Sequence, residues 1–130
     1  MGQQVSNQSV KDSTELRVWQ LSMDLAESIY RETRSFPSHE QFGLTSQLRR
    51  AAVSVPSNIA EGHTRNQTGE YLRFLAISRG SLAEIKTQLL ISQRLEYLPT
   101  GTAGTLIDRT TDLLRQVTSL RTAIEKHASK

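Results

Sequence analysis

Apolar residues recur at the spacing of an α-helix in four successive segments of this 130-residue chain. No segment alternates apolar and polar side chains for long enough to predict a half-buried strand. A length of 130 residues suits one domain and leaves little room for two. Because the four segments are joined by short connections, they are typical of an up-down-up-down bundle. We therefore expect an all-α, antiparallel four-helix bundle that forms a single domain over residues 15–128.

The first segment, from Leu16 to Phe36, is more apolar than a surface helix needs to be. Its apolar side chains cover an arc of roughly 220°, interrupted only by Ser22, whereas a stripe of about 100° is enough to pack against one core. Since a chain of this size has little further interior, the excess predicts contact with other copies of the chain. The arc consists of Leu16, Trp19, Met23, Ala26 and Tyr30 on one face and Val18, Leu21, Leu25 and Ile29 on the adjoining face.

The second segment combines a narrow apolar stripe with an internal proline. Ser38 and Gln41 match a capping box at its beginning, and Gly62 is placed as its C-terminal stop. Pro56 removes the backbone hydrogen bond to Ala52, which costs about 3 kcal/mol. Because the apolar stripe keeps its phase across Pro56, we expect one helix that is kinked there.

A polar stripe runs along the same segment, and two interpretations of it stay open. Buried polar groups must find partners, so the stripe can be a structural hydrogen-bond network. Alternatively, it can be a patch that faces a ligand. Arg50 is expected to pair with Glu61 or with Glu84 of the third segment. The stripe consists of Gln47, Arg50, Ser54, Ser57, Asn58 and Glu61.

The remaining boundaries follow from proline, glycine and polar residues. The third helical segment continues to Leu98 and is stopped by Pro99. Residues 100–104, with the sequence TGTAG, predict a loop, and a capping residue, Thr105, precedes the fourth apolar stripe. Residues 1–14 are polar and without periodicity, and we expect them to be a disordered tail.

The sequence contains no pattern of an enzyme, a metal site or a cofactor site. It has no Cys, which excludes disulfides, thiolate metal ligands and Cys nucleophiles. The three histidines, His39, His63 and His127, lie far apart and form neither an i,i+4 pair nor a Glu-x-x-His motif. There is no phosphate-binding glycine loop. We therefore expect a protein with no catalytic residues, no cofactor and no bound metal.

Two features of the sequence indicate where in the cell the protein is located. The longest apolar runs are far shorter than the ~18–20 residues needed to cross a bilayer. The first residues contain no apolar region of a secretory signal. The expected location is the cytoplasm, without a membrane partner.

Arginine dominates the positive charges. The chain has 16 Lys+Arg against 13 Asp+Glu, a formal net charge of +3, and twelve of the sixteen cations are Arg. Arginine suits carboxylates and phosphates, so the excess fits internal ion pairs or contact with nucleic acid. Aromatic residues, which stack on bases, are few. Any nucleic-acid binding is therefore expected to lack sequence preference, and the candidate residues are Arg49, Arg50, Arg65 and Arg73.

Several segments resemble a known family. They are LRVWQLSMDLAESIY, FPSHEQFGLTSQLRRAAVSVPSNIAEG, EYLRFLAISRGSLAEIKTQL and ISQRLEYL, which together cover about Leu16 to Leu98. These segments resemble the four-helix bundle protein family, also called the 23S rRNA intervening-sequence protein or S23 family. The resemblance is carried by positions to which we assign structural or interface roles: Trp19, Gln47, Pro56, Asn58, Glu61, Gly62, Gly80, Ser81 and Glu84.

The resemblance implies an antiparallel bundle that assembles as a homopentamer around a central channel. A protein of similar fold, the accessory variability determinant of diversity-generating retroelements, is a basic pentamer that binds nucleic acid and a reverse transcriptase. We therefore expect a non-enzymatic, ring-forming bundle that binds RNA or DNA without strong sequence preference. The alternative is a protein-interaction scaffold or an accessory factor for a nucleic-acid enzyme such as a reverse transcriptase.

Overall fold

The computed structural model describes the backbone of residues 2–128 and the side chains of residues 14–127. Within these residues the chain is all-α, with four α-helices and no strand, as the periodicity predicts. Two short 3₁₀ turns, Thr33–Ser35 and Ser38–Glu40, connect the first two helices. The helices are α1 (Gly2–Glu32), α2 (Leu44–His63), α3 (Thr68–Arg94) and α4 (Thr100–Ala128).

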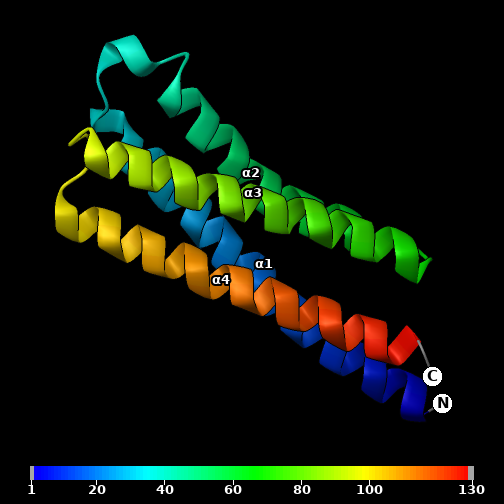
Figure 1. Ribbon diagram of the computed structural model, residues 1–130. Coiled ribbons are helices and arrows are strands. Elements are labelled where there is room, and N and C mark those ends of the chain that lie inside the picture. The colour runs from blue at the N-terminus through cyan, green and yellow to red at the C-terminus, as the bar shows by residue number, and fades with distance from the viewer. Residues whose placement is uncertain (1, 129–130) are drawn as a thin grey trace.

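Each helix packs against two others around one core. α3 packs most closely, against α2 and α4, whereas α1 contacts α2 and α4 less extensively. The beginning of α1 and the end of α4 lie at one end of the bundle, and the α1–α2 and α3–α4 connections lie at the other (Figure 1). The deeply buried side chains include Leu25 and Ile29 of α1, Leu48 and Ile59 of α2, Leu75, Leu82, Ile85 and Leu89 of α3, and Val117 of α4.

The helix α1 begins at Gly2, so its backbone includes residues 2–14, for which the composition predicts a disordered tail. Nucleating a helix is the costly step, whereas extending one that is already packed adds a hydrogen bond for each residue fixed. The polar composition of residues 1–14 indicates that they have no apolar face for packing. It does not show that continuing an existing helix costs little free energy. The domain boundary at residue 15 stays a prediction.

Two predicted helix starts are wrong. The capping box expected at Ser38 is absent, because residues 38–40 form a 3₁₀ turn and α2 begins six residues later. The backbone N–H of Leu44 instead donates to the side chain of Glu40, at 3.1 Å. The segment predicted as a loop at residues 100–104 is the first turn of α4, in which Ala103 is fully buried and donates its N–H to the carbonyl of Pro99.

Gly62 lies inside α2, one residue before its end, and is not the stop that the sequence predicts. Its lack of a side chain allows α2 and α3 to approach closely. A Cβ at this position would lie 3.0 Å from the Cβ of Phe74 and 3.0 Å from a ring carbon of Tyr71. Gly80 of α3 has the opposite environment, because a Cβ there would meet nothing within 4 Å.

A small cluster joins the two connections at one end of the bundle. The hydroxyl of Tyr97, after α3, donates to Glu40 Oε2 at 2.8 Å. The ring of Tyr97 packs against the ring of buried Phe36 with a centroid distance of 5.4 Å, and the ring of His39 lies edge-on at 6.4 Å. The N–H of Leu44 and the hydroxyl of Tyr97 hold the pKa of Glu40 below its ordinary value, and His39 adds a smaller attraction. The same hydrogen bond to Glu40 raises the pKa of Tyr97.

No helix among the described residues is both long and apolar enough to span a bilayer.

Alanine substitutions at Gly62 and Gly80 are expected to change the free energy of unfolding in opposite directions. Gly62→Ala is expected to lower the free energy of unfolding by about 1–3 kcal/mol, because the new methyl group overpacks the contact with Phe74 and Tyr71. Gly80→Ala is expected to raise it by about 0.5–1 kcal/mol, because alanine favours the helix and meets no neighbour. Urea unfolding measures both. Equal effects of the two substitutions would contradict this account of the α2–α3 contact.

Removing the Glu40 carboxylate is expected to change stability in a pH-dependent way. Since the pKa of Glu40 is lowered on folding, its stabilising contribution is present above the ordinary value of 4.5 and is lost as the pH falls through the lowered value. The stability difference between the wild type and Glu40→Gln is therefore expected to be constant near neutral pH and to shrink in acid. Glu96→Gln, at an exposed residue of the α3–α4 connection, is the control. A difference that grows below pH 4.5 would contradict the assignment.

Candidate functional site

The four arginines predicted to bind nucleic acid do not form one patch. Arg49 lies near the beginning of α2, and Arg65 lies just beyond its end. The helix between them places these two residues about 20 Å apart.

Arg49 is part of the contact between α1 and α2. Its Nε donates to Thr33 Oγ1 at 2.9 Å, and its Nη2 donates to the carbonyl of Tyr30 at 3.3 Å. Its guanidinium lies over the Tyr30 ring, 4.8 Å from the centroid. A cation at the C-terminal end of a helix also interacts favourably with the helix dipole. These contacts give Arg49 a structural role at the end of α1.

Arg65 and Arg73 lie against the same aromatic ring at the α2–α3 turn. Their guanidinium carbons lie 4.9 and 4.6 Å from the centroid of Phe74. Arg65 pairs with Glu61 at 2.5 Å, and Arg73 pairs with Glu70 at 3.2 Å. Two carboxylates thus balance two arginines, so this cluster attracts an anion weakly.

Arg50 is exposed, and the ion pair predicted for it is not formed among the described residues. Its first expected partner, Glu61, pairs with Arg65, which lies one helical turn further along the chain. Its second, Glu84, is exposed on α3 and makes no ion pair with a described residue. Local i,i+4 geometry outcompetes pairing over longer distances, because neighbouring turns bring such side chains together.

Two residues of the polar stripe, Ser54 and Gln47, contact α3, and Asn58 is engaged within α2 itself. Asn58 Nδ2 donates to the carbonyl and the hydroxyl of Ser54, at 2.8 and 3.0 Å, and Ser81 donates to the same hydroxyl at 2.8 Å. Nearer the beginning of α2, Gln88 donates to Gln47 at 3.4 Å. These contacts favour the structural network over a ligand-facing patch.

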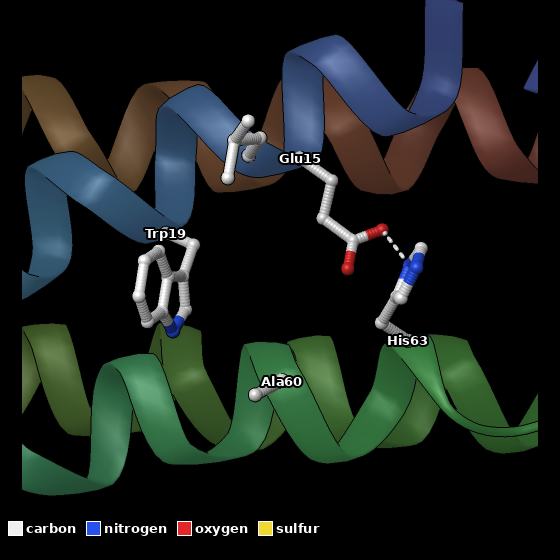
Figure 2. A pocket seen from close by; sticks show the side chains of 5 residues that line it. Glu15, Trp19, Ala60 and His63 are labelled. Carbon is white, nitrogen blue, oxygen red and sulfur yellow. Dashed lines mark hydrogen bonds and ion pairs between the residues drawn. The ribbon is translucent and has the colours of Figure 1, made fainter. Parts of the chain in front are cut away.

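A groove of about 410 Å³ lies between α1 and α2. Figure 2 shows Glu15 and Trp19 of α1 on one side of it and Ala60 and His63 of α2 on the other. Trp19 is half-buried here and packs against the edge of the core. Leu16 completes the lining, which is mainly apolar.

Glu15 ties three helices together at this groove. Its side chain is buried, and Oε2 accepts a hydrogen bond from the hydroxyl of Tyr71 on α3. The Nδ1 of His63 lies 2.7 Å from the same oxygen. Sequence reasoning missed this group, because Glu15 stands at the edge of the predicted tail and its partners are 48 and 56 residues away. No periodic signal links such distant positions.

A second groove, of about 450 Å³, lies on the other side of α1, against α4. Arg17 and Arg115 both line it, and neither makes an ion pair or a hydrogen bond with a described residue. Arg17 carries no distinguishing signal in the sequence, because isolated basic residues on exposed helix faces are common. The remaining polar lining consists of Thr14, Asp112, Gln116 and Ser119.

The described residues bring together no group of three or more His, Cys, Asp or Glu side chains that could hold a metal ion.

Replacing Arg49 is expected to affect stability much more than replacing its neighbour. Arg49→Ala leaves the hydroxyl of Thr33 and the carbonyl of Tyr30 without this donor, and a loss of about 1–3 kcal/mol is expected. Arg50→Ala removes an exposed side chain and is expected to stay within about 0.5 kcal/mol of the wild type. Thermal unfolding at matched protein concentration measures both. A larger loss for Arg50→Ala would show that Arg49 does not have the structural role assigned to it.

Comparison with known proteins gives one family. A search of curated proteins finds no match. A solved structure, described as a protein with unknown function from the S23 ribosomal protein family from Bacteroides thetaiotaomicron, has the same fold with a TM-score of 0.77. The two sequences are 18% identical, and the match covers 84% of this chain and 98% of the other. A family model described as 23S rRNA-intervening sequence protein matches residues 14–119, so the chain belongs to that family.

Proposed function

We propose that this protein is a non-enzymatic helical bundle whose copies assemble into a ring and that it binds RNA or DNA through the backbone phosphates, without strong sequence preference. The observation that supports the proposal is that half of the arginines, six of twelve, have no ion pair or hydrogen bond with a described residue. Unpaired guanidinium groups on a surface attract phosphates. These residues are Arg17, Arg34, Arg50, Arg79, Arg94 and Arg115.

The architecture within this proposal is an antiparallel up-down-up-down bundle, with α2 kinked at Pro56. The order of the α2–α3 contacts supports it, because residue numbers fall along one helix as they rise along the other. Pro56 is buried inside α2 and has no N–H for the carbonyl of Ala52, which is the usual cause of a kink. The contacting pairs are Gln47 with Gln88, Ser54 with Ser81, and Gly62 with Tyr71.

Self-assembly is supported by the surface of α1. Leu16, Met23 and Tyr30 repeat every seven residues and are 54%, 45% and 42% exposed in the single chain. A sustained seven-residue spacing places apolar side chains on one seam, as in helices that pair with another helix. We propose that this seam contacts a second copy, and that the ring is the pentamer implied by the resemblance to the S23 family.

Assembly strengthens the case for nucleic acid. Five copies with a net charge of +3 carry 5 × 3 = +15. Each exposed arginine then recurs five times around one axis, so a polyanion contacts several copies at once. Such multivalent contact raises affinity without any new kind of interaction.

A protein-interaction scaffold is the second candidate, and one observation favours it. Apolar side chains away from the α1 seam are also exposed, and Phe42 is 91% exposed in the α1–α2 connection. On α3, Ile77 and Ile91 are exposed two turns of helix on either side of Glu84. A partner protein such as a nucleic-acid enzyme is the occupant that this candidate requires.

Binding to nucleic acid is expected to depend steeply on salt and little on sequence. Fluorescence anisotropy with RNA and DNA probes of unrelated sequence, measured between about 50 and 200 mM salt, tests this. Log K is expected to fall linearly with log salt, by about 0.9 for each duplex phosphate contacted. A flat plot, or no binding at the lowest salt, would exclude the proposal and leave the scaffold.

A further inference from the structure

We infer that the groove between α1 and α4 is an oxyanion site that takes a backbone phosphate of nucleic acid between Arg17 and Arg115. The inference rests on the proposed function and names the surface that carries it. This surface differs from the one that the sequence predicts, because it includes none of Arg49, Arg50, Arg65 and Arg73.

Helix geometry brings the lining residues together. On α1, Thr14 and Arg17 are three residues apart and so lie on one face. On α4, Asp112, Arg115 and Ser119 are three and four residues apart and likewise share a face. Because the groove lies between these two faces, Arg17 and Arg115 both line the same space of about 450 Å³. That volume lies within the range of ~300–1,000 Å³ typical of ligand sites.

The charges favour an anion. Arg17 and Arg115 contribute two positive charges to the lining, and Asp112 contributes the only negative one, which leaves a formal charge of +1 among the described residues. The carboxylate of Asp112 accepts a hydrogen bond from Gln116 Nε2 at 2.9 Å. It forms an ion pair with neither arginine. Both guanidinium groups therefore keep their donors available.

The neutral groups of the lining suit a phosphate as well. The hydroxyls of Thr14 and Ser119 can each donate one hydrogen bond. Guanidinium groups bind phosphate oxygens in a bidentate way, and charge-assisted hydrogen bonds of this kind are about twice as strong as neutral ones. The groove on the other side of α1 lacks this character, because its lining includes the carboxylate of Glu15 and no arginine or lysine.

Three of the four arginines of the predicted site are less suited to the task. The guanidinium of Arg49 already donates hydrogen bonds to Thr33 and Tyr30. Arg65 and Arg73 would have to leave the carboxylates of Glu61 and Glu70. A phosphate would have to compete with these acceptors for the guanidinium groups. In the α1–α4 groove it would not, because Arg17 and Arg115 are not bonded to a described acceptor.

Substitutions in the full-length protein test the site with a short RNA probe. Arg17→Gln and Arg115→Gln are each expected to weaken binding about three- to tenfold at about 50 mM salt and to lower the salt slope by about one. Asp112→Asn is expected to strengthen binding, because it removes the opposing charge. The control is Arg31→Gln, also on α1, which removes the same charge from a guanidinium that already pairs with Glu27. It is expected to leave affinity nearly unchanged.

The outcomes separate this inference from the proposed function. If the wild type binds RNA and all three arginine variants weaken it equally, binding follows net charge and the α1–α4 site is wrong, while the proposed function stands. If the wild type binds neither RNA nor DNA, the proposed function fails. The site is then judged with inorganic pyrophosphate by NMR, in which shifts confined to the amides around Arg17 and Arg115 would support it and absent or scattered shifts would overturn it.

Discussion

The attachment of α1 to the other helices is the constraint on which the rest of the structure depends. One half of its apolar arc is buried, with Val18, Leu25 and Ile29 almost inaccessible to solvent. On the other half, Leu16, Met23 and Tyr30 are largely exposed in the single chain, whereas Trp19 and Ala26 are partly buried against the core. α3 packs closely against α2 and α4, whereas α1 contacts the same two helices less extensively. The exposed apolar side chains of α1 are the reason that we propose a contact between α1 and another copy.

Polar contacts fix α1 at both ends of its packed part. Glu15 bonds to Tyr71 and His63 at one end, and Arg49 holds Tyr30 and Thr33 at the other. Such contacts contribute less free energy than apolar burial, but they have directions and lengths that apolar contacts lack. They therefore set the position of α1, and with it the width of the groove that contains Arg17 and Arg115.

The helices and most of the core could be predicted from the sequence, because periodicity reports which face of a helix meets the interior. Leu48 and Ile59 of α2 lie where their spacing places them. Helix ends were less predictable, since they depend on single side chains. The N–H at the beginning of α2 is bonded by Glu40 and not by the cap expected at Ser38. Gly62 lies inside α2, where this helix and α3 approach closely.

The roles of the arginines could not be predicted from the sequence for a similar reason. Their number is visible in the sequence, but which of them are engaged depends on neighbours contributed by other helices. Arg49 is engaged because α1 ends beside it. Arg115 makes no ion pair or hydrogen bond with a described residue, and the described α1 residues that line its groove include Arg17 but no carboxylate. Sequence spacing alone could not separate these two cases.

Sedimentation velocity over a series of protein concentrations tests the central claim most directly. We predict that the wild type sediments as an assembly at micromolar concentration, that Met23→Glu on the exposed seam sediments as a monomer, and that Ile77→Glu, at a similarly exposed position of α3, remains assembled. A wild type that sediments as a single monomeric species throughout would contradict the claim that α1 requires a second copy.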